Sequence, residues 1–261
     1  MEKAGWFVEE VPWTADIEDW SMFDAVVIRS TWDYQSDPVR FMAVLDRIES
    51  QTLLFNSARV CRWNLDKIYL KDLHHQGVPI VPTEWGSELS AELAGSAMER
   101  FNRQKLIVKP RVGANADDTF ILSTEGDASW RSAFSAFKRR PFLLQPFVAS
   151  VVQTGEYSLF YFAGKHSHTI LKQPAVGDFR VQEEHGGLIT LAAAPDDIRA
   201  VADHAMRCAG ESLLYGRADV VRLDSGSAAV MELELIEPSL YFDQDSEAPQ
   251  RFVDAFLSML V

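Results

Sequence analysis

Three carboxylates near the carboxyl-terminal end of the sequence have the spacing of a cation site. Glu232 and Glu234 stand two residues apart in one predicted strand, so they share a face and lie roughly 6–7 Å apart along it. Asp219 lies on the neighbouring predicted strand. Like charges about 4 Å apart repel by roughly 4 kcal/mol at an effective dielectric constant near 20, so such a cluster usually needs a cation. Oxygen ligands favour Mg²⁺ or Mn²⁺ over zinc. An exposed acidic strand face is the alternative.

Two lysines have surroundings that suit phosphate binding. Lys109 ends a predicted strand and is followed, after Pro110, by a loop of small residues at 113–118. An ammonium group and several backbone N–H groups can meet a polyphosphate in such a loop. Lys67 follows Asn64 at the predicted start of a helix. The sequence contains neither GxxxxGK[ST] nor GxGxxG. Taken singly, an ordinary hairpin and a solvated helix lysine are the simpler explanations.

A polar residue also closes an apolar run in Gln145-Pro146-Phe147-Val148. A proline at the end of a strand leaves backbone groups free of the ladder, and free groups suit the edge of an adenine ring. A plain strand end is the alternative.

The elements that must position these residues follow from hydrophobic periodicity and turn signals. Up to about residue 57 the order is strand, helix, strand, which predicts a small parallel α/β unit. Asp37-Pro38 opens its helix as N-cap and first helical residue. Its strands are predicted at 6–11, 23–28 and 53–56. Further helices are predicted at 65–76, 91–102, 128–139 and 196–213, and strands at 106–110, 120–122, 142–145, 157–162, 167–172, 188–192, 215–222 and 228–235.

The composition is that of an ordinary globular protein, with 47% hydrophobic and 24% charged residues. A formal net charge of -13 argues against extended nucleic-acid binding, although a local cluster of lysine and arginine can still hold ATP. No apolar run approaches the ~20 residues of a membrane span. The two cysteines have no metal-ligand spacing, which favours a reduced, cytoplasmic chain. The sequence leaves a homodimer open.

The order of these motifs resembles the ATP-grasp superfamily. Between Asn56 and Tyr241 the sequence has the two lysines, the Gln-Pro-Phe-Val hinge, Gly-Glu-Tyr-Ser, Arg-x-Asp and then Glu-x-Glu. The match is closest to the prokaryotic glutathione-synthetase-like branch. The motifs at 29–34, 177–182 with 186–187, and 232–239 are similar to the group that includes the O-ureidoserine cyclo-ligase of cycloserine biosynthesis.

The resemblance implies a fold of mixed α+β and α/β class, in which two α+β subdomains enclose ATP behind a small parallel α/β unit. The implied domains are 1–57, 58–144 and 145–261. Relatives begin with a strand and a helix before the segment that matches 6–11, so the first domain is expected to be shortened. The implied activity joins a small amino-acid-like carboxylate to an amine through an acyl phosphate, with an intramolecular cyclisation as one form. A degenerate nucleotide-binding protein without turnover is the alternative.

The resemblance also implies a role for each residue of the ATP site. Lys67 and Lys109 would contact the α- and β-phosphates, under a lid formed by the loop that begins at Gly113. Gln145 would hold adenine together with the backbone of Phe147 and Val148, and Glu156 would bind the ribose.

The remaining implied roles concern metal and substrate. Asp219, Glu232 and Glu234 would bind two Mg²⁺ (or Mn²⁺) ions, although glutathione synthetases have Asn where Glu234 stands. Arg217 would reach the acyl phosphate and the tetrahedral intermediate. Arg180 would hold the acceptor carboxylate or the γ-phosphate. Further substrate contacts are expected from Arg29, Thr31 and Asp33.

Overall fold

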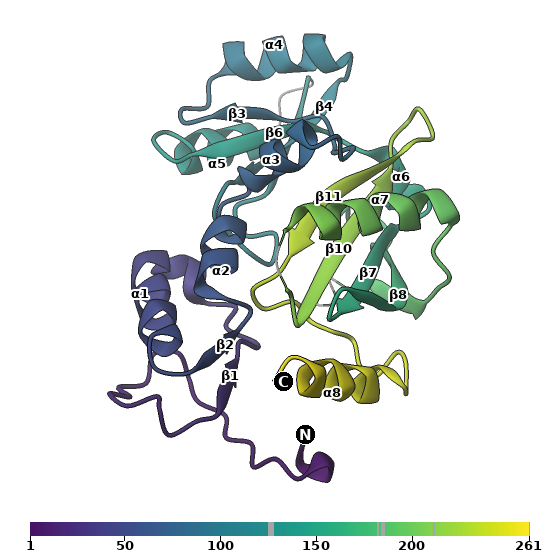
Figure 1. Cartoon of the computed structure of the whole chain (residues 1–261). Helices are drawn as coiled ribbons and strands as arrows, with labels where there is room; N and C mark the ends of the chain where they lie inside the picture. The colour runs from purple at the N-terminus through teal and green to yellow at the C-terminus, as the bar shows by residue number, and fades with distance from the viewer. Residues whose placement is uncertain (125–127, 182, 184–185, 211, 261) are drawn as a thin grey trace.

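Three β-sheets organise the chain in this computed structural model, which describes residues 1–124, 128–181, 183, 186–210 and 212–260. A two-stranded, a four-stranded and a five-stranded sheet each carry their own helices (Figure 1). The two larger units are α+β and the first is a small parallel unit, so the predicted fold class is confirmed. None of the described helices is long and apolar enough to cross a membrane.

The amino-terminal unit contains the predicted parallel strands and helix. β1 (Ala25–Val27) pairs with β2 (Leu53–Phe55), and α1 (Pro38–Glu49) connects them. The Asp37 side chain accepts a hydrogen bond from the backbone N–H of Arg40 at 3.1 Å, which confirms the N-cap. Two short 3₁₀ turns, η1 (Glu2–Ala4) and η2 (Tyr34–Ser36), complete the unit.

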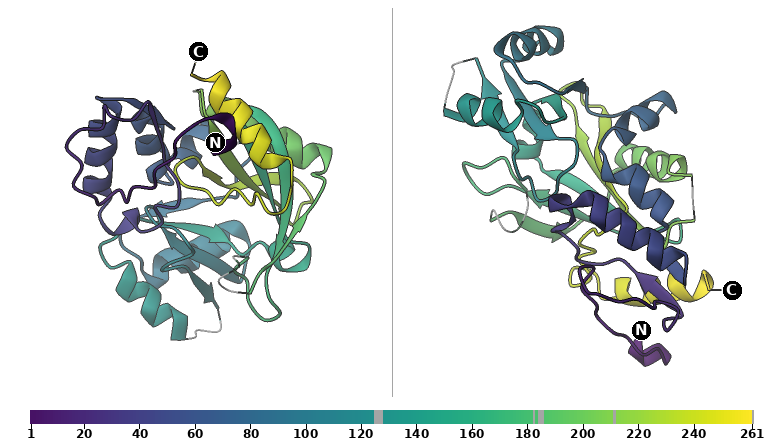
Figure 2. Two further views of the ribbon diagram at one scale, coloured as in Figure 1. Left: turned by 90° about the horizontal axis from the view of Figure 1, so that it is seen from below. Right: turned by 90° about the vertical axis from the view of Figure 1, so that its left-hand side faces the viewer.

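The strand predicted at 6–11 is wrong, because this segment has no strand in the structure. The ring of Trp6 packs edge-on against Phe256 of α8 (Ala248–Ser258), with 5.2 Å between ring centroids. Aromatic packing on α8 therefore fixes this segment instead of a ladder, and the two chain ends lie near each other (Figures 1 and 2).

The four-stranded sheet has the order β3-β6-β4-β5. The predicted hairpin is confirmed, since β4 (Lys105–Pro110) pairs antiparallel with β5 (Phe120–Ser123). β6 (Phe142–Pro146) extends one residue past its predicted end, and β3 (Glu84–Gly86) adds an edge strand that was not predicted. α4 (Ala91–Phe101) and α5 (Ala128–Ala136) pack with the alternate residues Leu106, Val108 and Leu122 in one core.

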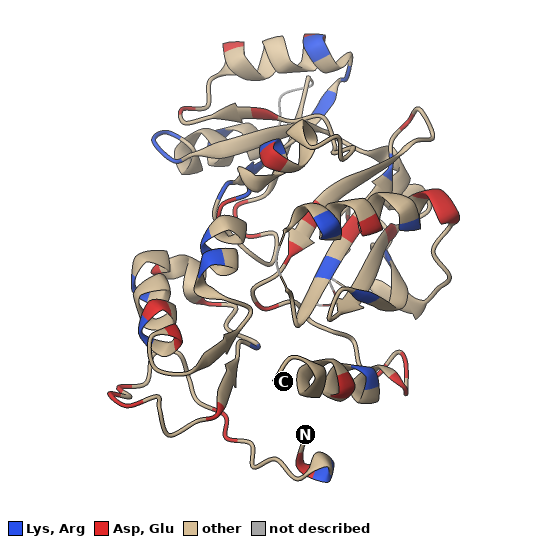
Figure 3. Cartoon of the chain, in the orientation of Figure 1, with Lys and Arg blue, Asp and Glu red and all other residues tan. Residues whose placement is uncertain are grey.

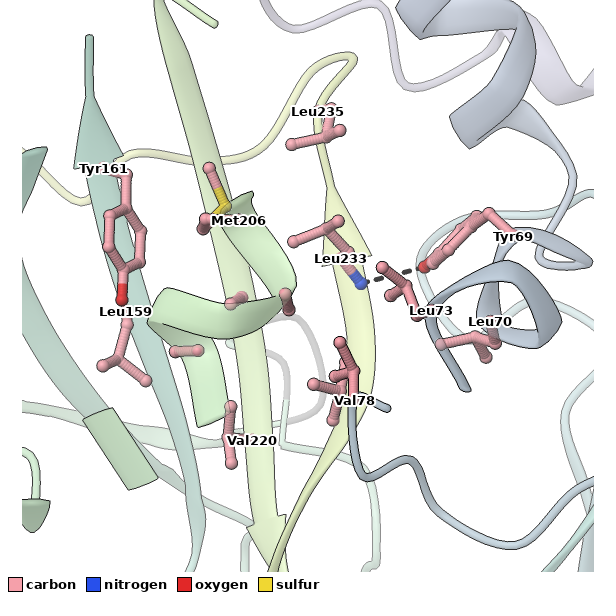
Figure 4. Close-up of a cluster of buried hydrophobic side chains, with 14 of the residues drawn as sticks. Tyr69, Leu70, Leu73, Val78, Leu159, Tyr161, Met206, Val220, Leu233 and Leu235 are labelled. Carbon is pink, nitrogen blue, oxygen red and sulfur yellow. Dashed lines mark hydrogen bonds between the residues drawn. The ribbon is translucent and has the colours of Figure 1, made fainter. Parts of the chain in front are cut away.

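The five-stranded sheet is antiparallel, in the order β11-β10-β7-β8-β9. One face packs against α7 (Asp196–Cys208), through Leu159, Ala218 and Leu233 among others (Figure 4). The other face has one apolar cluster where α8 packs on it and a second where Val148 packs with Val221 and Ala229. Its strands are β7 (Glu156–Phe162), β8 (Lys165–Gln173), β9 (Leu188–Leu191), β10 (Tyr215–Arg222) and β11 (Ala228–Glu234).

The helix predicted at 65–76 begins only at Tyr69, as α3 (Tyr69–His75), and it is preceded by a turn and by a separate helix, α2 (Ala58–Leu65). In this turn the Asp66 carboxylate accepts a hydrogen bond from the backbone N–H of Ile68 at 3.0 Å and pairs with Arg111 at 2.5 Å. A side chain that bonds its own backbone in this way competes with the helix. The turn, and not a helix start, therefore carries Lys67.

Side chains from α2 and α3 cover the outer edge of β11. Asn64 donates to the carbonyl of Leu233 at 2.7 Å and accepts from the N–H of Leu235 at 2.8 Å. The hydroxyl of Tyr69 accepts from the N–H of Leu233 at 2.8 Å, the dashed contact in Figure 4. The edge of β11 is thus closed by side chains at Leu233 and Leu235 and by the backbone of residues 79–81 at Val230.

The other differences from prediction are lengths and short elements. α7 ends at Cys208 and not at Leu213, because Gly210 follows with a positive φ of 73°. The short helix α6 (Ala149–Gln153), together with β3, α2 and α8, was not predicted.

Candidate active site

One cavity lies between the four-stranded and five-stranded sheets, and most of the predicted site residues line it. They come from both sheets, from the α2–α3 turn and from the hinge after β6. These residues are Lys67, Lys109, Gly113, Gln145, Phe147, Val148, Glu156, Arg180, Arg217, Asp219, Glu232 and Glu234.

Strand alternation explains why the floor of the cavity is charged. On β10, Arg217 and Asp219 point to the face opposite α7, whereas Ala218 between them packs on that helix. The register pairs Asp219 with Glu232 and Arg217 with Glu234. Basic and acidic segments therefore lie next to one another on β10 and β11 (Figure 3).

Arg217 links two of the predicted metal ligands. Its guanidinium donates to Asp219 at 3.0 Å and also pairs with Glu234. Burial works against the charge of Asp219, but Arg217 and Lys172 hold its pKa below the usual value. Burial raises the pKa of Glu234 to about 7, since Arg217 only partly offsets it. The two carboxylates are thus in different protonation environments.

Lys172 of β8 is a cavity residue that the sequence analysis missed. It is 4% exposed, and its ammonium group lies 2.6 Å from Glu156 and 3.4 Å from Asp219. Burial lowers the pKa of a lysine, but these two carboxylates raise it overall. The sequence did hold one sign of its role: Lys172 stands two residues after the apolar Ile170 in a predicted strand, so the two share a face that is buried. A charge at that position needs a buried partner.

The two predicted phosphate ligands converge on one carboxylate. Lys67 lies 2.9 Å from Glu232 and Lys109 lies 3.7 Å from it. Lys67 also donates to the carbonyl of Gly113 at 2.6 Å, which ties the small-residue loop to the α2–α3 turn. Burial opposes the charge of Glu232, yet the two lysines lower its pKa. Burial lowers the pKa of Lys109.

The three predicted metal ligands are engaged with lysine and arginine. In the part of the chain that the structure describes, no group of three or more His, Cys, Asp or Glu side chains is arranged to hold a metal ion by itself. The donor set nevertheless fits a hard cation, because all three groups are carboxylates on one sheet face. Such an ion would need oxygens from a ligand as well.

At the hinge, Gln145 is buried and its amide donates to the Thr83 hydroxyl at 3.0 Å. The N–H of Phe147 donates to the carbonyl of Lys105 at 3.0 Å. Phe147 therefore offers the cavity a carbonyl oxygen and not an N–H group. Pro146 stays inside the ladder opposite Leu106, so it does not release the strand as the sequence suggested.

Arg180 reaches the cavity from the loop after β8. Its guanidinium is paired with Asp178 at 2.7 Å, and hydrogen bonds from Arg180 hold the pKa of Asp178 well below its usual value. Gln182 of the same predicted motif lies outside the described residues.

The amino-terminal loop reaches the cavity through residues other than those expected. Trp32 and Tyr34 line it, whereas Arg29, Thr31 and Asp33 do not. Arg29 lies over the ring of Tyr215, 5.5 Å from its centroid. Asp33 turns outward and accepts a hydrogen bond from the indole of Trp13 at 2.7 Å. Loop residues have no fixed side-chain periodicity, so the sequence could not say which of them face inward.

Relatives of known name match this chain along most of its length. Residues 1–56 match the D-cycloserine synthetase DcsG N-terminal domain. The chain is 33% identical over 264 residues to the cycloserine biosynthesis protein DcsG of Streptomyces lavendulae, an alignment that covers 97% of this chain and 88% of that protein.

Solved structures agree with this match. The crystal structure of D-cycloserine synthetase DcsG has a TM-score of 0.83 and 32% identity, and the match covers 95% of this chain and 88% of that one. The ATP-grasp ligase PsnB, in complex with a phosphomimetic precursor variant, Mg and ADP, has a TM-score of 0.62 at 20% identity, over 91% of this chain and 79% of that one. At that identity the likeness concerns the fold alone.

The charged cavity lies between two α+β units, and the sequence similarity covers both this cavity and the amino-terminal loop beside it. The chain therefore belongs to the DcsG family of ATP-grasp ligases and is an ATP-using enzyme.

Proposed function

We propose that this ligase is a cyclo-ligase, which joins a carboxylate to a nitrogen atom of the same small amino acid, as in the formation of D-cycloserine. The observation that supports this most is the match of residues 1–56 to the amino-terminal domain of D-cycloserine synthetase. That segment supplies Trp32 and Tyr34 to the cavity. The ATP-binding sheets serve ligases of many substrates, so similarity in this loop bears more directly on the substrate.

In the proposed complex, ATP lies between the two larger sheets. Lys67 and Lys109 would exchange Glu232 for the α- and β-phosphates, and the loop at Gly113 would cover them. Both lysines already point into the same space as Glu232, which supports a short movement of their ammonium groups.

Adenine would lie against the hinge, with Gln145, the carbonyl of Phe147 and the backbone of Val148 at its edge. Glu156 would bind the ribose hydroxyls while it keeps Lys172 as a partner, because a carboxylate can accept several hydrogen bonds.

Phosphoryl transfer brings two anions together, so positive charge is needed where the γ-phosphoryl group moves. Arg217 would supply this charge at the acyl phosphate, and Arg180 at the γ-phosphate or the acceptor carboxylate. The substrate carboxylate takes the γ-phosphoryl group and ADP leaves. A nitrogen of the same molecule then attacks the acyl carbon, and phosphate leaves.

Asp219, Glu232 and Glu234 would hold Mg²⁺, or Mn²⁺, together with phosphate oxygens. When bound, the metal would neutralise charge on the phosphates. The carboxylate donors of this chain and the Mg named in the PsnB complex support the assignment.

Arg29, Thr31 and Asp33 stand behind Trp32 and Tyr34, so we propose that they act on the substrate mainly by shaping this loop. Thr31 and Arg29 have buried polar atoms that could still reach a ligand after a side-chain movement.

The test is ADP release from Mg-ATP with O-ureido-D-serine, its L enantiomer, D-serine, and D-alanine pairs, with mass detection of the products. We expect ADP and a five-membered ring product from one ureidoserine enantiomer. Linear dipeptide products without a ring would overturn cyclisation. ATP binding without ADP release from any of these compounds would instead support a nucleotide-binding protein that lacks turnover.

A further inference from the structure

Glu237 is a buried carboxylate in the cavity to which the ATP and metal assignments give no role. It follows β11 and lines the same cavity as Glu234, with 9% of its surface exposed. The buried hydroxyl of Tyr34 lies close enough to its carboxyl group to lower the pKa of that group. The indole N–H of Trp32 donates to its backbone carbonyl at 3.1 Å. Glu237 thus joins the cavity floor to the amino-terminal loop.

The carboxyl group of Glu237 has no ion-pair partner among the described residues. The nearby cations Lys67 and Arg217 are paired with Glu232 and Glu234 instead. Burial, together with repulsion from Glu234, raises the pKa of Glu237 to about 8. A buried carboxylate costs free energy unless a positive group or hydrogen bonds compensate it. The free protein compensates it poorly, so a ligand with a positive group fits this position.

The loop that faces Glu237 also has unsatisfied polar groups. Three of the five buried side-chain polar atoms that lack a partner among the described residues belong to it, namely those of Arg29, Thr31 and Gln35. Buried polar atoms in proteins are nearly always hydrogen-bonded, and exceptions call for an explanation such as an absent ligand. These three residues do not line the cavity themselves, but they flank Trp32 and Tyr34, which do, so the loop beside Glu237 is where unsatisfied polar groups are concentrated.

We infer that Glu237 is the specificity residue that receives the substrate's ammonium group, with Tyr34 orienting its carboxylate. This inference rests on the proposed function, since it concerns the α-amino acid that the ligase would cyclise. In the proposed reaction a different nitrogen of the substrate attacks the acyl phosphate, so the α-ammonium group is left free to bind Glu237. It would donate to the carboxylate while the rings of Trp32 and Tyr34 border it. The enzyme would thereby select substrates with a free α-amino group.

The experiment compares two ring compounds that differ only in the amino group: D-cycloserine and isoxazolidin-3-one. Binding is measured by calorimetry in the presence of Mg²⁺ and a non-hydrolysable ATP analogue. We expect the wild-type protein to bind D-cycloserine about 30-fold or more tightly than the ring without the amine, as befits a desolvated charge pair. In Glu237→Gln this preference falls to about threefold or less, while the affinity for the ATP analogue stays unchanged.

Two further variants make the result specific. Glu99→Gln removes an exposed carboxylate of α4 and should leave the preference intact. Tyr34→Phe removes only the hydroxyl, so it should reduce the preference less than Glu237→Gln does, and it tests the inference if Glu237→Gln fails to fold. Equal binding of the two rings by the wild-type protein, including no binding of either, overturns the inference, as does a full preference in Glu237→Gln.

The proposed function fails separately from this inference. If the wild-type protein binds D-cycloserine more tightly than isoxazolidin-3-one but forms no ring product from O-ureidoserine, the ammonium site is supported and the cyclisation is refuted. If the wild type and Glu237→Gln both form the ring with the same KM for O-ureidoserine, the cyclisation is supported and the ammonium site is refuted.

Discussion

At the scale of single residues, the cavity's lysines, arginine and carboxylates are one another's partners. Glu232 pairs with Lys67 and Lys109, and Arg217 pairs with Asp219 and Glu234. Removal of one member therefore affects both ligand binding and the charge left on its partners.

Glu232→Ala should lower kcat for ADP release by about 10²-fold or more, because the variant loses stabilisation of charge in the transition state. The measurement is steady-state kinetics with saturating Mg-ATP and the best substrate found. Glu99→Ala, an exposed site on α4, is the matched control and should behave as the wild type. Near-normal turnover in Glu232→Ala would remove this residue from the metal site.

Glu237→Gln should also change how stability depends on pH. The pKa of Glu237 is about 8 in the native state against a usual 4.5, so the native state keeps a proton that the unfolded chain loses between these values. This residue therefore makes the free energy of unfolding fall as pH rises from 4.5 to 8. The variant should lose that part of the slope in urea unfolding at a series of pH values. An unchanged slope would contradict the burial of this carboxyl group.

The sequence pointed to these charged residues, which line one cavity, but not to their partners. Alternation alone placed Glu232 and Glu234 on one face of a strand, whereas the position of Asp219 opposite Glu232 depends on the pairing of β10 with β11. That Lys172 completes the set depends on β7 pairing with the distant strand β10, which the order of strands in the sequence does not specify. Likewise, which of the loop residues around Trp32 face the cavity depends on packing against the distant residue Glu237.

At the scale of elements, the exposed edge of β11 is closed by α2 and α3. This arrangement fixes the strand that carries Glu232 and Glu234. The sequence predicted β11, but it missed α2 and began the next helix too early, at residue 65, because Asp66 turns the chain through its contacts with Ile68 and Arg111. Similarly, the alternation at 6–11 suits a strand, but the structure offers it an aromatic surface on α8 and no neighbouring strand.

Asn64→Ala should destabilise the protein by about 2–4 kcal/mol, because it leaves a buried carbonyl of Leu233 and a buried N–H of Leu235 without partners. Chemical denaturation gives the free energy of unfolding. Arg62→Ala, on the same helix, removes only an exposed ion pair with Asp46 and should cost about 1 kcal/mol or less. A similar small loss for both variants would contradict the role of Asn64 at this edge.

At the scale of the whole molecule, the cavity that we propose for the nucleotide lies between two units that are joined at the hinge after β6 (Figure 1). The small-residue loop projects from the four-stranded sheet toward the five-stranded one, and Asn115, Ala116 and Asp118 in it have positive φ values. A few polar contacts hold it, among them Arg140 to Asp118 at 2.5 Å.

A non-hydrolysable ATP analogue with Mg²⁺ should slow proteolysis of the loop at 113–118, because phosphates under the loop add contacts that hold it closed. Mass spectrometry of the fragments gives the cleavage sites and rates. We expect a slowing of about tenfold or more at saturation, and none in Lys67→Met, which lacks one phosphate ligand. Equal protection of the wild type and Lys67→Met would contradict the proposed contact.

The mutual pairing of cations and carboxylates in the cavity gives ATP binding the character of an exchange. A lysine that leaves Glu232 for a phosphate exchanges one anionic partner for another. ATP binding therefore removes little lysine charge from water that was exposed before. The carboxylate that it leaves becomes available as the nucleotide arrives. Nucleotide affinity should accordingly vary less with ionic strength than in a site whose lysines stand free in solvent, because buried pairs are screened far less than exposed ones.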